Sequence, residues 1–100
     1  MPRLIWTQEA IQDVDRLYKF LAEKNVEAAR KAAKVILDET TKIEAFPEIG
    51  RPAEFINVYC RELLVPFGVS GYVVLYRYDG QLTTILAVKH QFEAGYLPEF

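Results

Sequence analysis

The chain has 100 residues with 12 Lys and Arg, 14 Asp and Glu and one His, a formal net charge of −2 at pH 7, and 51 % of it is hydrophobic. This length fits a single domain over residues 1–100, and the hydrophobic content excludes intrinsic disorder. A lone cysteine, Cys60, excludes an internal disulfide and is typical of a cytoplasmic protein. No hydrophobic run reaches the ~18 residues of a membrane span, so no membrane association is expected. Direct nucleic-acid binding is also not expected, because it usually needs a basic excess.

Two amphipathic helices are predicted before Pro47. Hydrophobic residues recur at helical spacing over residues 8–23 and again over 26–45. Thr7 and Asn25 precede these segments, and their short polar side chains can accept hydrogen bonds from the first free amides. Because only a tight connection fits between the two segments, we expect an antiparallel helical hairpin. Two prolines and a glycine within residues 46–52 then end the helical part.

The hydrophobic period changes from 3.6 to 2 after Pro52. Residues 59–65, 72–78 and 82–90 predict three antiparallel strands in meander order, and residues 4–6 predict a further strand at an edge. The dipeptide Asp79-Gly80 predicts a two-residue turn that pairs Tyr78 with Gln81. The expected architecture is α+β, with the helical hairpin packed on one face of a three- to four-stranded antiparallel sheet.

This register divides the sheet residues between two faces. The first face carries Val73, Leu75, Arg77, Leu82, Thr84, Leu86, Val88 and His90. The second carries Tyr72, Val74, Tyr76, Tyr78, Thr83, Ile85, Ala87 and Lys89. We expect the first face to be the core side. The second face, here called the tyrosine face, is too hydrophobic to be left to water and is expected to be covered by something else.

Few residues suggest catalysis or metal binding. The single His90, at the end of a strand, is expected to cap the strand or bind a partner. One His and one Cys without paired-ligand spacing are too few for a metal site, and no phosphate-binding or nucleophile-elbow motif is present, so no cofactor is expected. Cys60 is expected to be a small buried hydrophobic residue, and Asp13 and Asp15 to be solvated helix charges.

The arginines of the second half are the strongest candidates for a binding role. Residues 47–100 contain only four basic side chains, Arg51, Arg61, Arg77 and Lys89, against six acidic ones. Arginine beside aromatic rings can bind phosphate or stack on bases, and it can also meet acidic groups of a protein. Four cations supply little binding energy compared with proteins that make about 6–10 phosphate contacts. A structural role, in which the arginines pair with Glu62 and Asp79, is equally consistent with the sequence.

Five segments follow one another in a distinctive order and spacing. They are residues 5–10 (IWTQEA), 46–52 (FPEIGRP), 60–63 (CREL), 71–77 (GYVVLYR) and 85–90 (ILAVKH), with Asp13 and Leu17 following the first. Together they resemble the RelE/ParE superfamily of bacterial toxin–antitoxin toxins over essentially the whole chain. The resemblance implies helices packed on an antiparallel sheet, and a toxin neutralised by a co-expressed antitoxin in a hetero-oligomeric complex.

The superfamily implies two alternative targets. ParE-like members inhibit DNA gyrase and pair with a ParD-like antitoxin, whereas RelE-like members cleave ribosome-bound mRNA with sheet lysines and arginines and a C-terminal tyrosine or histidine. No lysine lies between Pro52 and Arg61 here, and Tyr96 is displaced toward the end of the chain. Only Arg61, Arg77 and His90 remain for a nuclease. The long helical hairpin, the Gly-Arg-Pro motif at 50–52 and the near-neutral charge favour the ParE-like branch.

The sequence therefore predicts a toxin that binds gyrase and is not an enzyme. The alternatives are an mRNA endoribonuclease and a non-toxic family member that only binds an antitoxin. The tyrosine face and the groove of the helical hairpin are expected to receive the antitoxin. The residues expected to bind antitoxin or target are Arg51, Arg61, Tyr72, Tyr76, Arg77, Tyr78 and His90.

Overall fold

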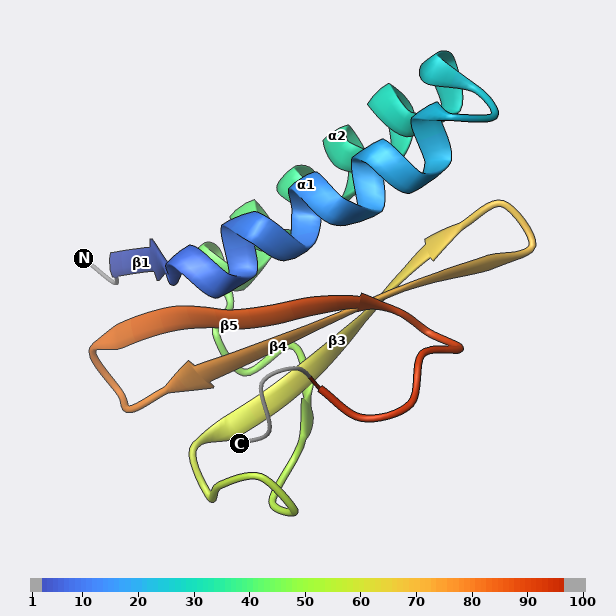
Figure 1. Cartoon of the computed structure of the whole chain (residues 1–100). Helices are drawn as coiled ribbons and strands as arrows, with labels where there is room; N and C mark the ends of the chain where they lie inside the picture. The colour runs from blue at the N-terminus through green and yellow to red at the C-terminus, as the bar shows by residue number, and fades with distance from the viewer. Residues whose placement is uncertain (1–2, 97–100) are drawn as a thin grey trace.

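Two helices cover one face of a five-stranded sheet in the computed structural model, which describes residues 3–96 (Figure 1). The helices are α1 (Gln8–Ala22) and α2 (Val26–Ala45), and the strands are β1 (Arg3–Trp6), β2 (Arg51–Pro52), β3 (Cys60–Phe67), β4 (Ser70–Tyr78) and β5 (Leu82–His90). The strand order is β1-β5-β4-β3-β2. The predicted α+β architecture is confirmed. No helix within residues 3–96 is long and hydrophobic enough to cross a membrane.

The predicted starts of both helices are confirmed by their caps. The Thr7 Oγ1 accepts a hydrogen bond from the Ala10 amide at 3.1 Å, and the Asn25 Oδ1 accepts one from the Ala28 amide at 3.0 Å. Caps of this kind each contribute about 1 kcal/mol to helix stability. Thr7 also donates to the Ile85 carbonyl at 3.1 Å, so the first residue before α1 is tied to β5.

The sheet differs from the prediction at both edges. Strand β1 pairs with β5 in parallel, with Arg3 opposite Leu82, and the two-residue β2 adds a fifth strand by pairing antiparallel with β3. The expectation of a purely antiparallel sheet is therefore wrong at β1. No turn joins β1 to β5, which are far apart in sequence, so the packing of α1 on the sheet sets the direction of β1.

The predicted pairing of Tyr78 with Gln81 is also wrong, because Tyr78 pairs with Thr83. The Asp79 Oδ1 accepts hydrogen bonds from the amides of Gln81 at 3.0 Å and Leu82 at 2.9 Å, which stabilises a longer loop than the two-residue turn. A second irregularity follows between Leu75 and Tyr76, which pair with Ala87 and Ile85 and leave Leu86 without a direct partner. After this β-bulge, the remaining β5 residues, 87–90, lie on the sheet face opposite to the one that uninterrupted alternation predicts.

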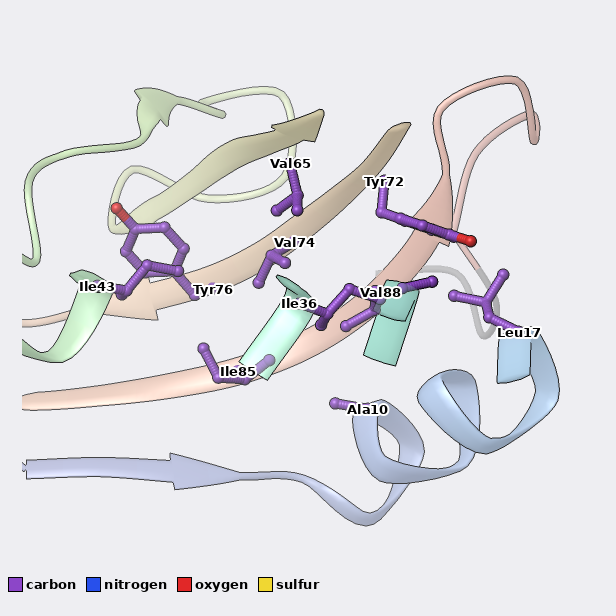
Figure 2. Packing of buried hydrophobic residues seen from close by; sticks show 11 residues of the cluster. Ala10, Leu17, Ile36, Ile43, Val65, Tyr72, Val74, Tyr76, Ile85 and Val88 are labelled. Atoms are coloured by element: carbon purple, nitrogen blue, oxygen red, sulfur yellow. The ribbon is translucent and has the colours of Figure 1, made fainter. Parts of the chain in front are cut away.

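The helices cover the tyrosine face, so the prediction of which face is the core side is wrong. Tyr76 and Val74 are fully buried, Tyr72 is 6 % exposed, and the bulge brings Val88 rather than Ala87 to this side (Figure 2). The tyrosine face is therefore filled by the chain's own helices and is not open to an antitoxin. The buried cluster comprises Ala10, Leu17, Ala32, Ile36, Ile43, Val65, Tyr72, Val74, Tyr76, Ile85 and Val88.

A smaller hydrophobic cluster lies on the opposite face of the sheet. It comprises Ala53, Cys60, Leu75, Ala87 and Tyr96, with Ile56 and Leu86 packed against it. The loop before β3 and the segment after β5 supply the residues that cover this end of the face. The Cys60 thiol is free and buried, as predicted, and burial raises its pKa.

Asp13 is not the solvated helix charge that the sequence predicts. Its Oδ2 accepts a hydrogen bond from the Val88 amide at 2.9 Å, on the β5 edge that β1 leaves open. Burial raises the Asp13 pKa more than this hydrogen bond lowers it. Asp15, in contrast, is exposed and pairs with Lys19 at 2.9 Å, as expected of a surface charge.

We expect Asp13→Asn to be at least as stable as the natural protein at pH 7, because asparagine keeps an acceptor for the Val88 amide without a buried charge. The pKa of Asp13 is higher in the folded than in the unfolded protein, because burial disfavours the charged carboxylate. The contribution of Asp13 to the free energy of unfolding therefore decreases as pH rises from about 4 through the folded-state pKa. Asp13→Asn should remove this decrease. Asp13→Ala should lose about 1–3 kcal/mol, since the Val88 amide loses its acceptor. Urea unfolding at several pH values checks both, and equal stability of the two variants would contradict the assignment.

Candidate partner-binding groove

The residues predicted to bind a partner are spread over the structure, and several are occupied by internal contacts. Arg61 and Tyr76 both bind the turn that follows α2. The Arg61 Nη1 donates to the Gly50 carbonyl at 2.6 Å and to the Glu48 carbonyl at 3.2 Å. The Tyr76 hydroxyl donates to the Pro47 carbonyl at 2.7 Å and accepts from the Gly50 amide at 2.8 Å. These two side chains hold the turn against the sheet.

Arg51 is bound in a second internal group. Its Nε and one of its terminal nitrogens each lie 3.1 Å from the Glu62 Oε1, and the Tyr96 hydroxyl donates to the Glu62 Oε2. Burial and the neighbouring carboxylate raise the Tyr96 pKa far above its usual range. The Lys89 Nζ lies 4.4 Å from the centre of the Tyr96 ring. This group ties the segment after β5 to the open face of the sheet.

Arg77 lies on the face of the sheet opposite the helices. Its Nη1 is 3.4 Å from the Asp79 Oδ2, and its guanidinium lies 5.0 Å from the centre of the Tyr59 ring. Both arginine pairings suggested by the sequence are therefore present: Arg51 pairs with Glu62, and Arg77 pairs with Asp79. Tyr78 is half-buried against the helix-side core.

His90 and Tyr72 are the two predicted residues that lie in a groove. The His90 Nδ1 accepts a hydrogen bond from the Phe92 amide at 3.2 Å, and the Nε2 lies 3.0 Å from the Ser70 Oγ. With Nδ1 accepting from the Phe92 amide, a proton on Nε2 can be donated to the Ser70 hydroxyl. The ring also packs edge-on against Tyr72, with centroids 5.7 Å apart. His90 thus caps the end of its strand, which is one of the two roles expected of it.

The groove is bordered by the second half of α1 and by the turn that joins β3 to β4, and its volume is about 750 Å³. Figure 1 shows these two segments at the same end of the molecule. Three side chains of the groove are strongly exposed hydrophobic residues: Phe20 at 67 %, Val69 at 106 % and Phe92 at 75 %. At its rim, Arg16 and Glu93 form a two-point ion pair at 3.1 and 3.3 Å. The lining residues are Arg16, Leu17, Phe20, Leu21, Phe67, Gly68, Val69, Ser70, Tyr72, His90, Phe92 and Glu93.

Sequence reasoning missed Phe20, Val69 and Phe92. The sequence contained an indication of their exposure. Phe20 lies outside the hydrophobic stripe of α1, and Val69 and Phe92 lie at a turn and just after a strand, where polar residues are usual. A second groove, of about 520 Å³, lies along the helical hairpin between α1 and α2. It is lined by Trp6, Ile11, Val14, Asp15, Tyr18, Ala33 and Leu37.

The three residues available to a nuclease are not brought together. Arg61 lies opposite Tyr76 and so shares the helix-covered face, whereas Arg77 lies on the other face. His90 pairs with Tyr72, five positions before Arg77, which corresponds to roughly 16 Å along the strand at ~3.3 Å per residue. Within residues 3–96, no cluster of His, Cys, Asp and Glu side chains is arranged to hold a metal ion.

We expect Tyr76→Phe to be destabilised by about 1–3 kcal/mol, because the Gly50 amide and the Pro47 carbonyl lose their buried partner. Tyr78→Phe is the matched control, since its ring is half-buried, and it should change stability by less than about 0.5 kcal/mol. Urea unfolding of the two variants checks the difference. Similar stabilities would show that the Tyr76 hydroxyl does not hold the turn.

Comparisons with known proteins agree with this fold. The family model described as "ParE toxin of type II toxin-antitoxin system, parDE" matches residues 4–95. The chain is 30 % identical over 84 residues to "Toxin RelE3" of Caulobacter vibrioides, and the match covers 84 % of this chain and 88 % of that protein. It is 29 % identical to "Toxin RelE1" of the same organism, and that match covers 84 % of this chain and 87 % of the relative. A solved structure titled "Chromosomal ParDE TA system from P. aeruginosa" superposes with a TM-score of 0.72 at 26 % identity, covering 90 % of this chain and 96 % of that one. This chain thus belongs to the ParE family within the RelE/ParE superfamily, the toxins of type II toxin–antitoxin systems.

Proposed function

We propose that this toxin acts by binding DNA gyrase and inhibiting it, and that a ParD-like antitoxin neutralises the toxin in a hetero-oligomeric complex. The observation that carries the first part is the separation of the residues a nuclease would need. Arg61, Arg77 and His90 lie on two faces of the sheet and at two ends of β4.

Cleavage of RNA without a metal needs an acid, a base and a cation at the same phosphate. Arg61 is engaged by two backbone carbonyls, and Arg77 is engaged by Asp79 and the Tyr59 ring. His90 is engaged at both ring nitrogens. A protein target demands none of this chemistry, and large hydrophobic side chains are exposed at the groove while the net charge of the chain is −2. Both features favour binding over turnover.

The antitoxin is proposed to occupy the groove at the end of α1. A groove walled by a helix on one side and a hairpin on the other suits an amphipathic helix that inserts hydrophobic side chains at i, i+3 and i+4. The exposed Phe20, Val69 and Phe92 would supply the hydrophobic contacts. The Arg16 guanidinium at the rim is 52 % exposed and can also meet an acidic residue of the antitoxin. The similar solved structure is titled as a toxin–antitoxin system, which supports a partner of this kind.

The target is tested by measuring two activities on one protein preparation. We expect the purified toxin to inhibit gyrase supercoiling of plasmid DNA and to leave ribosome-bound mRNA intact, because Arg61, Arg77 and His90 are not assembled into one site. Addition of the antitoxin should restore supercoiling. Cleavage of ribosome-bound mRNA that is lost in His90→Phe would instead establish the nuclease alternative. Absence of both activities, with tight antitoxin binding, would identify a non-toxic family member.

The groove is tested by the double variant Phe20→Ser/Phe92→Ser. Both side chains are exposed, so the fold should be retained, while the antitoxin affinity should fall by about 10- to 100-fold as two aromatic contacts are lost. Val26→Ser is the matched control, because Val26 is 47 % exposed at the start of α2 and lines neither groove. Calorimetric titration with the antitoxin checks the difference. Unchanged affinity in the double variant would place the antitoxin elsewhere.

A further inference from the structure

The loop before β3 carries a second group of exposed hydrophobic side chains, far from the groove. In residues 53–59, here called the 53–59 loop, Phe55 and Val58 are each 71 % exposed and Tyr59 is 49 % exposed. Three exposed large hydrophobic side chains therefore fall within five residues of this loop, and exposed hydrophobic residues grouped in this way are typical of binding surfaces. Neither groove is lined by any of them.

The 53–59 loop is held rigid by its own hydrogen bonds. The Ala53 amide donates to the Cys60 carbonyl at 2.9 Å, the Ile56 amide to the Ala53 carbonyl at 3.0 Å, and the Cys60 amide to the Asn57 carbonyl at 3.0 Å. The Asn57 Oδ1 accepts a further hydrogen bond from the Tyr59 amide at 2.8 Å. Its backbone is thus closed on itself and on the start of β3.

Two side chains anchor the loop from inside. Ala53 is fully buried and Ile56 is partly buried, and both belong to the smaller hydrophobic cluster with Cys60 and Leu75. Because these anchors fix one side of the loop, Phe55 and Val58 cannot turn inward without breaking the cluster. A hydrophobic surface already held in place loses little entropy on binding, which favours recognition.

The charges around the loop favour a protein partner over a nucleic acid. Arg77 lies against Tyr59 and pairs with Asp79, and Glu54 adds another negative charge within the loop. These three charged groups sum to −1, so the surface offers no net positive charge to a phosphate backbone. Exposed aromatic rings beside an arginine are instead the composition of protein–protein binding surfaces.

We propose that the 53–59 loop, together with Arg77, is the surface by which this toxin contacts its protein target, DNA gyrase, through a hydrophobic pocket on that target. The inference rests on the proposed function and adds the surface that carries it. From the pair Cys60–Arg77 to the pair Phe67–Ser70, β3 advances seven residues, which is about 23 Å at ~3.3 Å per residue. The loop thus lies at the end of β3 opposite the turn to β4, as Figure 1 shows, and that turn borders the groove. On this proposal, target binding and antitoxin binding use opposite ends of β3.

The test is a reciprocal comparison of two double variants. Phe55→Ser/Val58→Ser should need at least a tenfold higher concentration to inhibit gyrase supercoiling, while its affinity for the antitoxin stays within twofold of the natural value. Phe20→Ser/Phe92→Ser should show the reverse. Since Phe55 and Val58 are both 71 % exposed, the thermal unfolding midpoint and the sedimentation coefficient of their variant should match those of the natural toxin.

Several results would overturn the inference. Full gyrase inhibition by Phe55→Ser/Val58→Ser, beside inhibition by the natural toxin, would remove the loop from the target surface and leave the proposed function intact. A parallel loss of antitoxin affinity would assign the loop to the antitoxin. A change in sedimentation would assign it to a second copy of the chain, and a loss of binding to a short DNA duplex would assign it to nucleic acid. Absence of inhibition by the natural toxin itself would refute the proposed function, and this inference with it.

Discussion

The extra residue in β5 is the constraint on which the arrangement of this molecule depends. Because Leu86 has no direct partner in β4, the residues after it change faces, and Val88 enters the core beneath the helices while Lys89 reaches Tyr96 on the other side. The edge of β5 beyond β1 is closed by side chains, with Thr7 donating to the Ile85 and Leu86 carbonyls and Asp13 accepting from the Val88 amide. The same shift places His90 beside Tyr72 in the groove.

The arginines of the sheet half are bound mainly within the protein. Arg61 fastens the turn after α2, and Arg51 joins Glu62 and Tyr96. Exposed hydrophobic side chains gather at the groove and at the 53–59 loop. Recognition of other proteins makes use of surfaces of this kind, whereas phosphate chemistry needs cations free to meet a substrate. This difference is the physical reason for proposing a toxin that binds a protein target rather than one that cleaves RNA.

The two surfaces meet different requirements. The groove is a concave site whose rim carries both an arginine and a glutamate, and it suits a helical segment that inserts hydrophobic residues. The 53–59 loop exposes Phe55 and Val58, and its own hydrogen bonds and two buried anchors hold it in shape. On the proposed assignment, target binding and antitoxin binding can change independently in sequence. The antitoxin would then have to extend along the toxin, or block access to gyrase by its bulk, in order to neutralise it.

The sequence by itself determined the family, both helices with their caps at Thr7 and Asn25, and the three long strands. These features depend on short-range spacing and on side chains that satisfy nearby amides. Only the tertiary structure decided which sheet face meets the helices, the direction of β1 and the role of Asp13. Each of these depends on contacts between residues far apart in sequence. The alternation placed the β4 tyrosines together on one face but could not indicate that the helices cover that face, and a single bulged residue moves only the end of β5 to the other face. The groove likewise arises only where distant segments meet.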